Sequence, residues 1–115
     1  WRRVGGTTRD WIARARRGAL TADERRGGCF TITNLGAFSV DAFTPIINPP
    51  ECAILGVGRI ERRPVMRGDD VIGREMTTLS LTFDHRIVDG ADAARFLVTV
   101  KNRLEEGDFA AELGL

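Results

Sequence analysis

The sequence predicts an α/β domain of the α+β type, and two patterns in its second half carry this prediction. From Met76 to Phe83, apolar and polar residues alternate, which is typical of a half-buried β-strand. Four apolar residues then recur at offsets of 4, 7 and 11, which is typical of an amphipathic helix. These residues are Ala93, Leu97, Val100 and Leu104. We therefore expect a strand that leads directly into a helix.

Shorter elements are predicted at the start of the chain. Thr7 to Asp10 resembles a capping box, and the apolar stripe that follows predicts a first helix ending before Gly18. Thr21 to Glu24 has the same form, with an acidic residue three positions after Thr, and predicts one short helical turn. Cys29 to Asn34 alternates between apolar and hydroxyl-bearing side chains, which predicts a strand.

The middle of the chain contains a loop, a buried strand and a turn. Leu35 to Glu51 has three prolines and no sustained period, but it is too apolar to lie in water. We expect an ordered loop that packs on the domain or on another subunit. Cys52 to Ile60 is a continuous apolar run typical of a buried strand. Arg67 to Asp70 predicts the turn before the strand that leads to His85.

Composition and charge predict one soluble domain. The 115 residues are 43% hydrophobic and 29% charged, and a net charge of +1 gives no electrostatic footprint for nucleic acid. No apolar run is long enough to span a bilayer and no signal peptide precedes the first helix, so we expect a cytoplasmic protein without a membrane partner. The arginine-rich first 28 residues can meet phosphates or an acidic partner, or form a solvated helix face.

The two cysteines do not predict a metal site. Cys29 and Cys52 are too far apart in sequence for a C-x-x-C motif, and the chain lacks a second histidine. Both lie in apolar, strand-like runs, so we expect small buried thiols in a reducing compartment.

The only histidine lies where the predicted strand meets the predicted helix. His85 and Asp89 are four residues apart in the segment from Asp84 to Gly90, where a junction can project side chains from a rigid frame. Two interpretations are open from these residues alone. The pair can carry chemistry, or Asp89 can cap the helix while His85 is an ordinary hydrogen-bonded histidine.

A resemblance to a known family favours the first interpretation. Asp84 to Gly90 resembles the signature of dihydrolipoyllysine-residue acyltransferases, the E2 components of 2-oxoacid dehydrogenase complexes, and is a variant of the His-x-x-x-Asp-Gly pattern of chloramphenicol acetyltransferase. Gly27 to Gly36 resembles the family's GGTFTxSNLG segment, and Asp41 to Val57 its proline-bearing loop and following strand. The resemblance covers most of residues 20–106, in family order and spacing.

The resemblance implies a fold and a domain organisation. The fold is the chloramphenicol-acetyltransferase-like mixed sheet flanked by helices. We expect residues 1–115 to correspond to the carboxyl-terminal half of the family's catalytic domain, without its lipoyl and subunit-binding domains.

The resemblance also implies roles for three residues. His85 matches the histidine that takes the proton from an attacking thiol, a task for which imidazole is suited near neutral pH. Thr33 matches the Ser/Thr that faces the developing oxyanion. Asp89 matches the motif's carboxylate, and we expect it to fix the loop that carries His85 through an ion pair or helix capping. Asp84 and Arg86 are expected to hold the same loop together.

Substrates and partners follow from the same resemblance. Asn34, Gly58 and Ile60 match positions beside coenzyme A, and the lipoyl group is expected in trans, with no metal and no acyl-enzyme. Family sites lie between subunits of a trimer, with the His from one subunit and the Ser/Thr from its neighbour. We therefore expect a homotrimer or its multiples, and association with the E1 and E3 components through other domains. An apolar tail that includes Phe109, Leu113 and Leu115 can fold back or join a neighbour.

Three functions remain in competition. The first is transfer of an acyl group, with acetyl preferred from the segment Asn34 to Pro50, between the lipoyl arm and coenzyme A. The second is a non-catalytic, core-forming scaffold of such a complex. The third is an unrelated acetyltransferase that acts on a small molecule and is indifferent to dihydrolipoamide.

Overall fold

The computed structural model describes residues 2–107 and 109. In chain order the elements are α1 (Arg2–Arg16), η1 (Asp23–Arg25), β1 (Thr31–Asn34), η2 (Gly36–Phe38), β2 (Ala53–Val57), β3 (Glu61–Arg67), β4 (Asp70–Met76), β5 (Leu79–Phe83) and α2 (Gly90–Glu106). Neither α1 nor α2, nor any other described helix, has the length and apolar character needed to cross a membrane.

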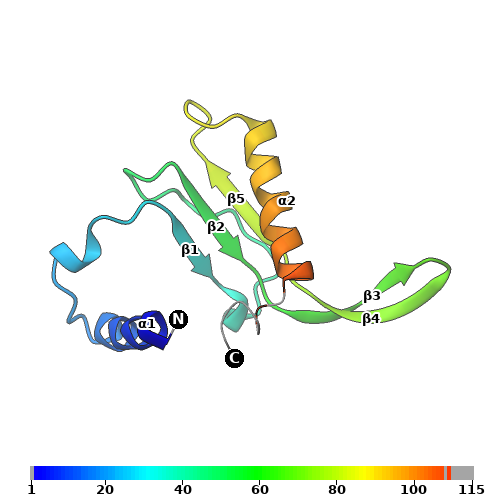
Figure 1. The fold of residues 1–115 in the computed structure, drawn as a ribbon, viewed down its shortest axis with the longest axis horizontal. Helices are drawn as coiled ribbons and strands as arrows, with labels where there is room; N and C mark the ends of the chain where they lie inside the picture. Colours follow the sequence, from blue (N-terminus) through cyan, green and yellow to red (C-terminus); the bar gives the residue numbers. More distant parts are fainter. Residues whose placement is uncertain (1, 108, 110–115) are drawn as a thin grey trace.

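The strands form a three-stranded mixed sheet and a separate hairpin (Figure 1). In the sheet, β2 lies between β1, to which it is parallel, and β5, to which it is antiparallel. β3 and β4 pair with each other and extend away from this sheet. The α+β class with a mixed sheet, which the sequence and its resemblance predict, is confirmed.

Helix α2 packs on one face of the three-stranded sheet. The strand register places Leu55 of β2 beside Leu81 of β5 on that face. The rings of Phe30 and Phe96 lie 5.6 Å apart and join the helix to the start of β1. Ala93, near the amino end of α2, is only 5% exposed. The predicted apolar stripe is therefore buried at Ala93 and half-buried at Leu97 and Val100, whereas Leu104 at its carboxyl end is 56% exposed.

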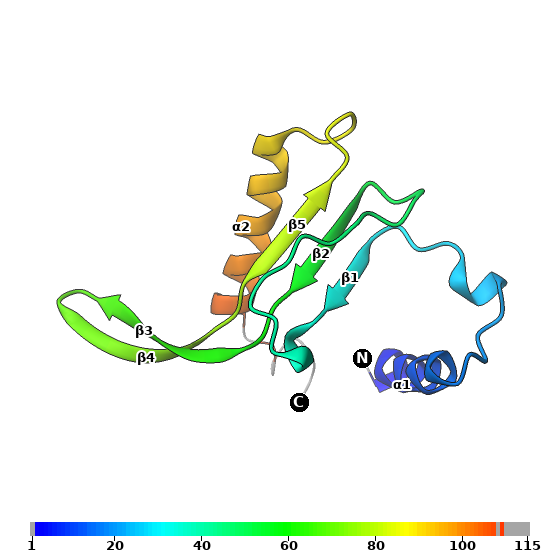
Figure 2. The same cartoon turned by 180° about the vertical axis from the view of Figure 1, so that it is seen from behind.

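The loop between η2 and β2 covers the opposite face, as Figure 2 shows from behind. A Cβ atom added at Gly56 would lie 3.0 Å from the ring of Phe43 and 3.3 Å from Pro45. The loop is therefore ordered and packed on the sheet, as its apolar composition predicts. Its other side faces solvent, because Ile46 is 88% exposed, as is Phe38 at the end of η2, which is 76% exposed.

Several of the predicted boundaries are wrong. The buried run predicted from Cys52 to Ile60 is a strand only from Ala53 to Val57. α1 begins at Arg2, so Thr7 lies inside the helix and does not cap it. The strand predicted from Cys29 begins only at Thr31, and the one predicted from Met76 begins at Leu79, because Met76 still pairs in the β3–β4 hairpin.

Cys29 is exposed and not buried as expected, because it lies in the bend that precedes β1, whereas Cys52 is half-buried. Of the predicted apolar tail, Leu113 and Leu115 lie outside the described residues.

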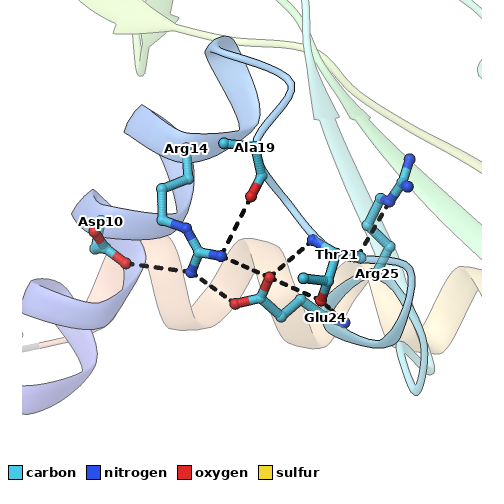
Figure 3. Close-up of polar contacts among 6 residues, drawn as sticks. All are labelled: Asp10, Arg14, Ala19, Thr21, Glu24 and Arg25. Carbon is cyan, nitrogen blue, oxygen red and sulfur yellow. Dashed lines mark hydrogen bonds and ion pairs between the residues drawn. The ribbon is translucent and has the colours of Figure 1, made fainter.

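The end of α1 and the turn after it are fixed by polar contacts (Figure 3). Gly18 has a φ of 67°, and the amide of Ala19 donates to the carbonyl of Arg14 at 2.9 Å, which is the Schellman arrangement that ends a helix. The capping box predicted from Thr21 to Glu24 is present, since these two residues exchange backbone-to-side-chain hydrogen bonds of 2.9 and 3.2 Å. Arg14 donates two more to Glu24, at 2.6 and 2.7 Å, and these contacts lower the pKa of Glu24 to about 2.

Replacement of Ile54 by alanine tests where the core lies. Ile54 is 5% exposed, so we expect Ile54→Ala to lower the free energy of unfolding by about 2–5 kcal/mol through lost burial and a new cavity. The matched control is Ile46→Ala, which removes the same atoms from an 88% exposed side chain and should change it by less than about 0.5 kcal/mol. Denaturant titration measures both values, and equal losses would contradict this description of the core.

Candidate active site

His85 lies directly after β5, at the junction with α2. Its ring contacts that of Phe83, with centroids 5.4 Å apart, and its side chain is exposed. The backbone before it is fixed to the sheet, because the amide of Asp84 donates to the carbonyl of Cys52 at 2.8 Å. The imidazole is therefore accessible from solvent, while the backbone that carries it is held by β2 and β5.

An ion pair holds the loop that carries His85. The guanidinium of Arg86 donates to both carboxylate oxygens of Asp84, at 2.6 Å from Nη2 and 2.9 Å from Nε. The carbonyl of Asp84 accepts the amides of Ile87 and Val88, each at 3.0 Å. The Arg86 side chain, and then its backbone amide, lower the pKa of Asp84 to about 2. The ion pair is the contact expected if Asp84 and Arg86 hold this loop together.

Asp89 caps the amino end of α2. Its Oδ1 accepts the amide of Gly90 at 2.7 Å, and its carbonyl accepts that of Ala93 at 3.0 Å. Among the described hydrogen bonds, none joins Asp89 to His85. Asp89 was expected to fix the loop through an ion pair or through helix capping, and the structure contains helix capping. The orientation of the helix relative to His85 thus depends on this carboxylate.

Thr33 lies at the other end of the sheet, near the carboxyl end of β1. It is half-buried and pairs with Gly56 of β2. Next to it, the side chain of Asn34 accepts the amide of Gly36 at 2.8 Å. The structure thus leaves the Thr33 hydroxyl on the loop-covered face of the sheet, beside a tight turn.

Gly58 and Ile60 follow β2 at this same end. A Cβ atom added at Gly58 would lie 2.0 Å from the carbonyl oxygen of Asp41, so only glycine lets the two segments approach this closely. The amide of Gly58 donates to the backbone carbonyl of Thr78 at 3.0 Å. Ile60 is 70% exposed. One end of the sheet therefore holds four of the predicted site residues, Thr33, Asn34, Gly58 and Ile60.

A cluster of four charged residues beside Gly58 has no counterpart in the sequence predictions. Arg59 and Arg63 both contact the carboxylates of Asp41 and Glu61; the Arg63–Asp41, Arg59–Glu61 and Arg63–Glu61 distances are 2.9, 3.1 and 3.2 Å. The pKa of Arg59 is raised, chiefly by its hydrogen bond to Asp41. The alternation of Arg59, Glu61 and Arg63 is visible in the sequence, but Asp41 comes from the distant loop and gives no local signal.

The structure does not bring His85 and Thr33 together within one chain. In the register of the sheet, Thr33 aligns with Ser80, whereas His85 lies five residues further along the antiparallel strand. Five residues of extended strand, at about 3.3 Å each, separate the two residues by roughly 15–20 Å along the strand direction. Figure 1 shows the loop after β5 and the carboxyl end of β1 at opposite ends of the sheet. The candidate residues therefore form two half-sites, one with His85 and Asp89 and one with Thr33, Asn34, Gly58 and Ile60.

Metal ligands do not gather in either half-site. Among the residues that the structure describes, no group of three or more His, Cys, Asp or Glu side chains could hold a metal ion.

A mixed sheet, one covering helix and a histidine at the strand-to-helix junction place the chain in the class of chloramphenicol-acetyltransferase-like α+β folds. Within that class the family is shown by sequence. Residues 3–111 match the family of 2-oxoacid dehydrogenases acyltransferase (catalytic domain), and the chain belongs to this family.

Curated relatives agree with this family. The chain is 53% identical, over 92% of its length, to the dihydrolipoyllysine-residue acetyltransferase component of the pyruvate dehydrogenase complex of Mycobacterium tuberculosis. It is 52% identical, over 81% of its length, to the acetyltransferase component of the acetoin cleaving system of Bacillus subtilis. A succinyltransferase component from Azotobacter vinelandii is 43% identical over 90% of the chain. The chain spans 20%, 23% and 26% of these relatives' lengths.

Solved structures agree as well. The chain superposes on Azotobacter vinelandii dihydrolipoamide acetyltransferase with a TM-score of 0.86 and 42% identity, covering 96% of this chain and 45% of the other. A cubic core of the pyruvate dehydrogenase multienzyme complex matches with a TM-score of 0.84 and 42% identity, covering 94% and 44%. The chain thus corresponds to slightly less than half of each solved chain.

Substitution of Arg86 tests the ion pair beside His85. In Arg86→Gln we expect the pKa of Asp84 to rise from about 2 toward its ordinary value, because the largest cause of its lowering is removed. A lowered carboxyl pKa contributes stability above about pH 4, which is lost as the pH falls toward about 2, so this acid-range loss should shrink in the variant. Carbon-13 NMR titration of the Asp84 carboxyl measures the shift.

The control for this experiment is Arg95→Gln, which removes an exposed Arg–Asp pair on α2. It should leave the titration of Asp84 unchanged. An Asp84 pKa that stays near 2 in Arg86→Gln would show that other contacts hold the loop.

Proposed function

We propose that this chain carries the catalytic residues of an acyltransferase that moves an acyl group between a dihydrolipoyl thiol and coenzyme A. The observation that carries the proposal is the exposed imidazole of His85 on a junction fixed by Asp84 and Asp89. Such a group is accessible to a substrate thiol and is suited to accept and return a proton near neutral pH.

The spacing of the candidate residues supports these roles. The solved Azotobacter vinelandii enzyme was studied for the roles of a serine, a histidine and an asparagine in its catalytic mechanism. In that enzyme the serine precedes the histidine by 52 residues, and the asparagine follows the histidine by four. The same intervals separate Thr33, His85 and Asp89 here. A threonine in place of the serine keeps the hydroxyl, and an aspartate in place of the asparagine keeps the capping oxygen.

The reaction requires one proton transfer and one exchange of sulfur at a carbonyl carbon. His85 takes the proton from the thiol of coenzyme A, whose sulfur then bonds to the carbonyl carbon of the acyl-lipoyl thioester. The tetrahedral intermediate collapses, the bond to the lipoyl sulfur breaks, and the proton passes from the imidazolium to that sulfur. Both substrates react in one ternary complex, so no acyl-enzyme forms and no metal is needed.

The Thr33 hydroxyl is the proposed donor to the oxyanion that forms when the sulfur adds to the carbonyl carbon, and this contact helps to offset the cost of forming the thiolate. Proton transfer from an ordinary thiol to an ordinary imidazole costs roughly 2.7 kcal/mol, because their pKa values differ by about 2 units. One hydrogen-bond donor aimed at a developing oxyanion contributes about 2.7–4 kcal/mol, which is the scale required. Asp84 and Asp89 act through His85 as positioning residues, because their contacts fix the loop and the helix on either side of it.

The half-site around Thr33 is the proposed contact for coenzyme A. Asn34 and Ile60 are exposed there, and the close packing of Gly58 fixes the backbone between them. These positions lie at the same end of the sheet as Thr33, which supports a substrate contact there.

A second copy of the chain completes the site. Because His85 and Thr33 lie at opposite ends of one sheet, a catalytic pair needs His85 of one copy and Thr33 of another. A homotrimer or its multiples provides this, and the related cubic core supports such an assembly. Association with E1 and E3 components is proposed through domains other than the described one.

Acetyl is the proposed acyl group. The segment Asn34 to Pro50 favours it, and two acetyltransferase relatives share 53% and 52% identity with the chain. Succinyltransferase relatives share 43–47% and a further acetyltransferase shares 46%, so the support from identity is modest.

A core-forming scaffold is the second candidate. The observation that favours it is the same separation of His85 from Thr33, since a chain that does not pair correctly with a neighbour has no complete site. Only the acyltransferase candidate turns over substrate, whereas the scaffold does not.

An acyl-transfer assay separates the candidates. We expect the assembled protein to transfer acetyl from acetyl-dihydrolipoamide to coenzyme A, and His85→Ala to lower kcat by at least about 100-fold, because proton transfer is lost. Thr33→Ala should lower kcat by about 100-fold or more through loss of the oxyanion contact. Asp23→Asn, in η1 and 94% exposed, is the control and should keep full activity.

Each outcome assigns a function. Absence of turnover at every concentration of the assembled wild-type protein would support the scaffold. Transfer to coenzyme A from other acetyl donors but not from the dihydrolipoamide thioester would instead support a small-molecule acetyltransferase.

A further inference from the structure

The two cysteines lie where β1 and β2 begin, at the end of the sheet that also carries His85 (Figure 1). The register of the two strands starts with Thr31 beside Ile54. Cys29 precedes Thr31 by two residues and Cys52 precedes Ile54 by two, so the same register, continued beyond the ladder, sets the cysteines opposite each other. Neighbouring strands lie about 4.8 Å apart, which is within the Cα separation of about 4.4–6.8 Å that a disulfide spans.

The side chain of Glu51 holds the segments of the two cysteines against each other. A Cβ atom added at Gly28 would lie 2.9 Å from Oε1 of Glu51. The hydroxyl of Thr31 donates to Oε2 of the same carboxylate at 2.5 Å. Cys29 lies between Gly28 and Thr31 in the chain, and Cys52 directly follows Glu51. Contacts before and after Cys29 therefore agree with the register in placing it beside Cys52.

The alternation of side chains along the strands directs both cysteines to one face of the sheet. Phe30 faces α2, because its ring lies 5.6 Å from that of Phe96. Cys29 is next to Phe30, so the alternation directs it to the opposite face, which the loop before β2 covers. Gly56 is on this loop-covered face, and Cys52 precedes it by four residues, which keeps the same face.

The two thiols differ in accessibility. Both are free, Cys29 is exposed and Cys52 is half-buried. In the family segment GGTFTxSNLG a threonine stands where this chain has Cys29, so the exposed thiol is a feature of this chain. An accessible cysteine beside a second one that can resolve its oxidised form is typical of redox sensors. Reversible disulfides of this kind also occur in proteins of reducing compartments.

Cys52 is connected to the junction that carries His85. Its backbone carbonyl accepts the amide of Asp84 at 2.8 Å, and Asp84 directly precedes His85. A disulfide between residues 29 and 52 would restrict local opening at this end of the sheet. The restraint on Cys52 would reach the junction through this one hydrogen bond.

We propose that Cys29 and Cys52 form a reversible disulfide when a hydroperoxide reaches Cys29, and that this bond restricts the motion of the junction that carries His85. The Cys29 sulfur attacks one oxygen of hydrogen peroxide, the O–O bond breaks, and the other oxygen leaves as water with the proton of the thiol. The Cys52 sulfur then displaces the hydroxyl group of the Cys29 sulfenic acid, which leaves as a second water with the Cys52 proton. Two thiols and one peroxide thus give one disulfide and two waters. The inference lies beyond the proposed function and does not depend on turnover.

Peptide mapping of the protein in its native assembly tests the bond. After treatment with hydrogen peroxide, cleavage at arginine and before Asp41 separates residues 27–40 from residues 41–59, which carry one cysteine each. We expect these two peptides to be joined, with the loss of two hydrogen atoms, and to separate again in dithiothreitol. In an assembly mixed from unlabelled and nitrogen-15-labelled copies, both joined peptides should have the same isotope form. Cys29→Ser is the control and should give no joined peptide.

Three results of this experiment would overturn the proposal. Thiols that stay reduced would show that the pair does not respond to a hydroperoxide. Oxidation of Cys29 alone to the sulfinic acid would show that Cys52 does not reach its sulfenic acid. Joined peptides of mixed isotope form would show a bond between copies and not within one chain.

Amide hydrogen exchange tests the effect on the junction. We expect exchange of the Asp84 amide to slow by about tenfold or more in the oxidised protein, because the opening that breaks its hydrogen bond to Cys52 is restricted. Peroxide-treated Cys52→Ser is the control, since it keeps the backbone carbonyl but lacks the bridge, and it should exchange at the rate of the reduced protein. The amide of Leu35, which donates to Val57 at the far end of the sheet, is the internal reference. Equal Asp84 rates in the two redox states would overturn the proposed effect on the junction.

Discussion

The pairing of β2 with two neighbours of opposite direction determines the arrangement of the candidate site. Because β1 runs parallel to β2, Thr33 and Gly58 emerge at the same end of the sheet. Because β5 runs antiparallel to β2, His85 emerges at the other end. The backbone hydrogen bond from Asp84 to Cys52 continues this ladder and fixes the start of the His85 loop. A single chain therefore presents two half-sites and cannot close them on each other.

The same small sheet bears on the proposed assembly. Its core is built on Ala53, Ile54, Leu55 and Ala93, and no described side chain is fully buried. Helix α2 covers one face and the loop before β2 covers the other, but α1 and the β3–β4 hairpin extend away from this core (Figures 1 and 2). A domain that buries so little apolar surface gains limited stability by itself. Contact with other copies can thus supply stability and complete the site at once.

Local patterns in the sequence were sufficient for the half-site that holds His85. The alternation before it, the helical period after it and the i, i+4 spacing to Asp89 identify strand, helix and cap, and all three are present. The wrong boundary at Met76 arose where long-range pairing decides, since Met76 is held by the hairpin and not by β5. The divided site and the contact of Asp41 with Arg63 were not predictable from local patterns, because both depend on sheet register between residues distant in sequence. Thr33 was identified only through the family resemblance, since a strand threonine alone carries no functional signal.

The most direct test of the divided site mixes two inactive variants. His85→Ala keeps Thr33, and Thr33→Ala keeps His85, so a site formed between two copies can recover both groups. If equal amounts of the two variants assemble at random, about one quarter of the sites between copies contain both intact residues. The structure therefore predicts recovery of about one quarter of wild-type acyl transfer in the mixture. Activity no greater than the average of the two separate variants, in an assembly shown by mass spectrometry to contain both, would contradict a site shared between copies.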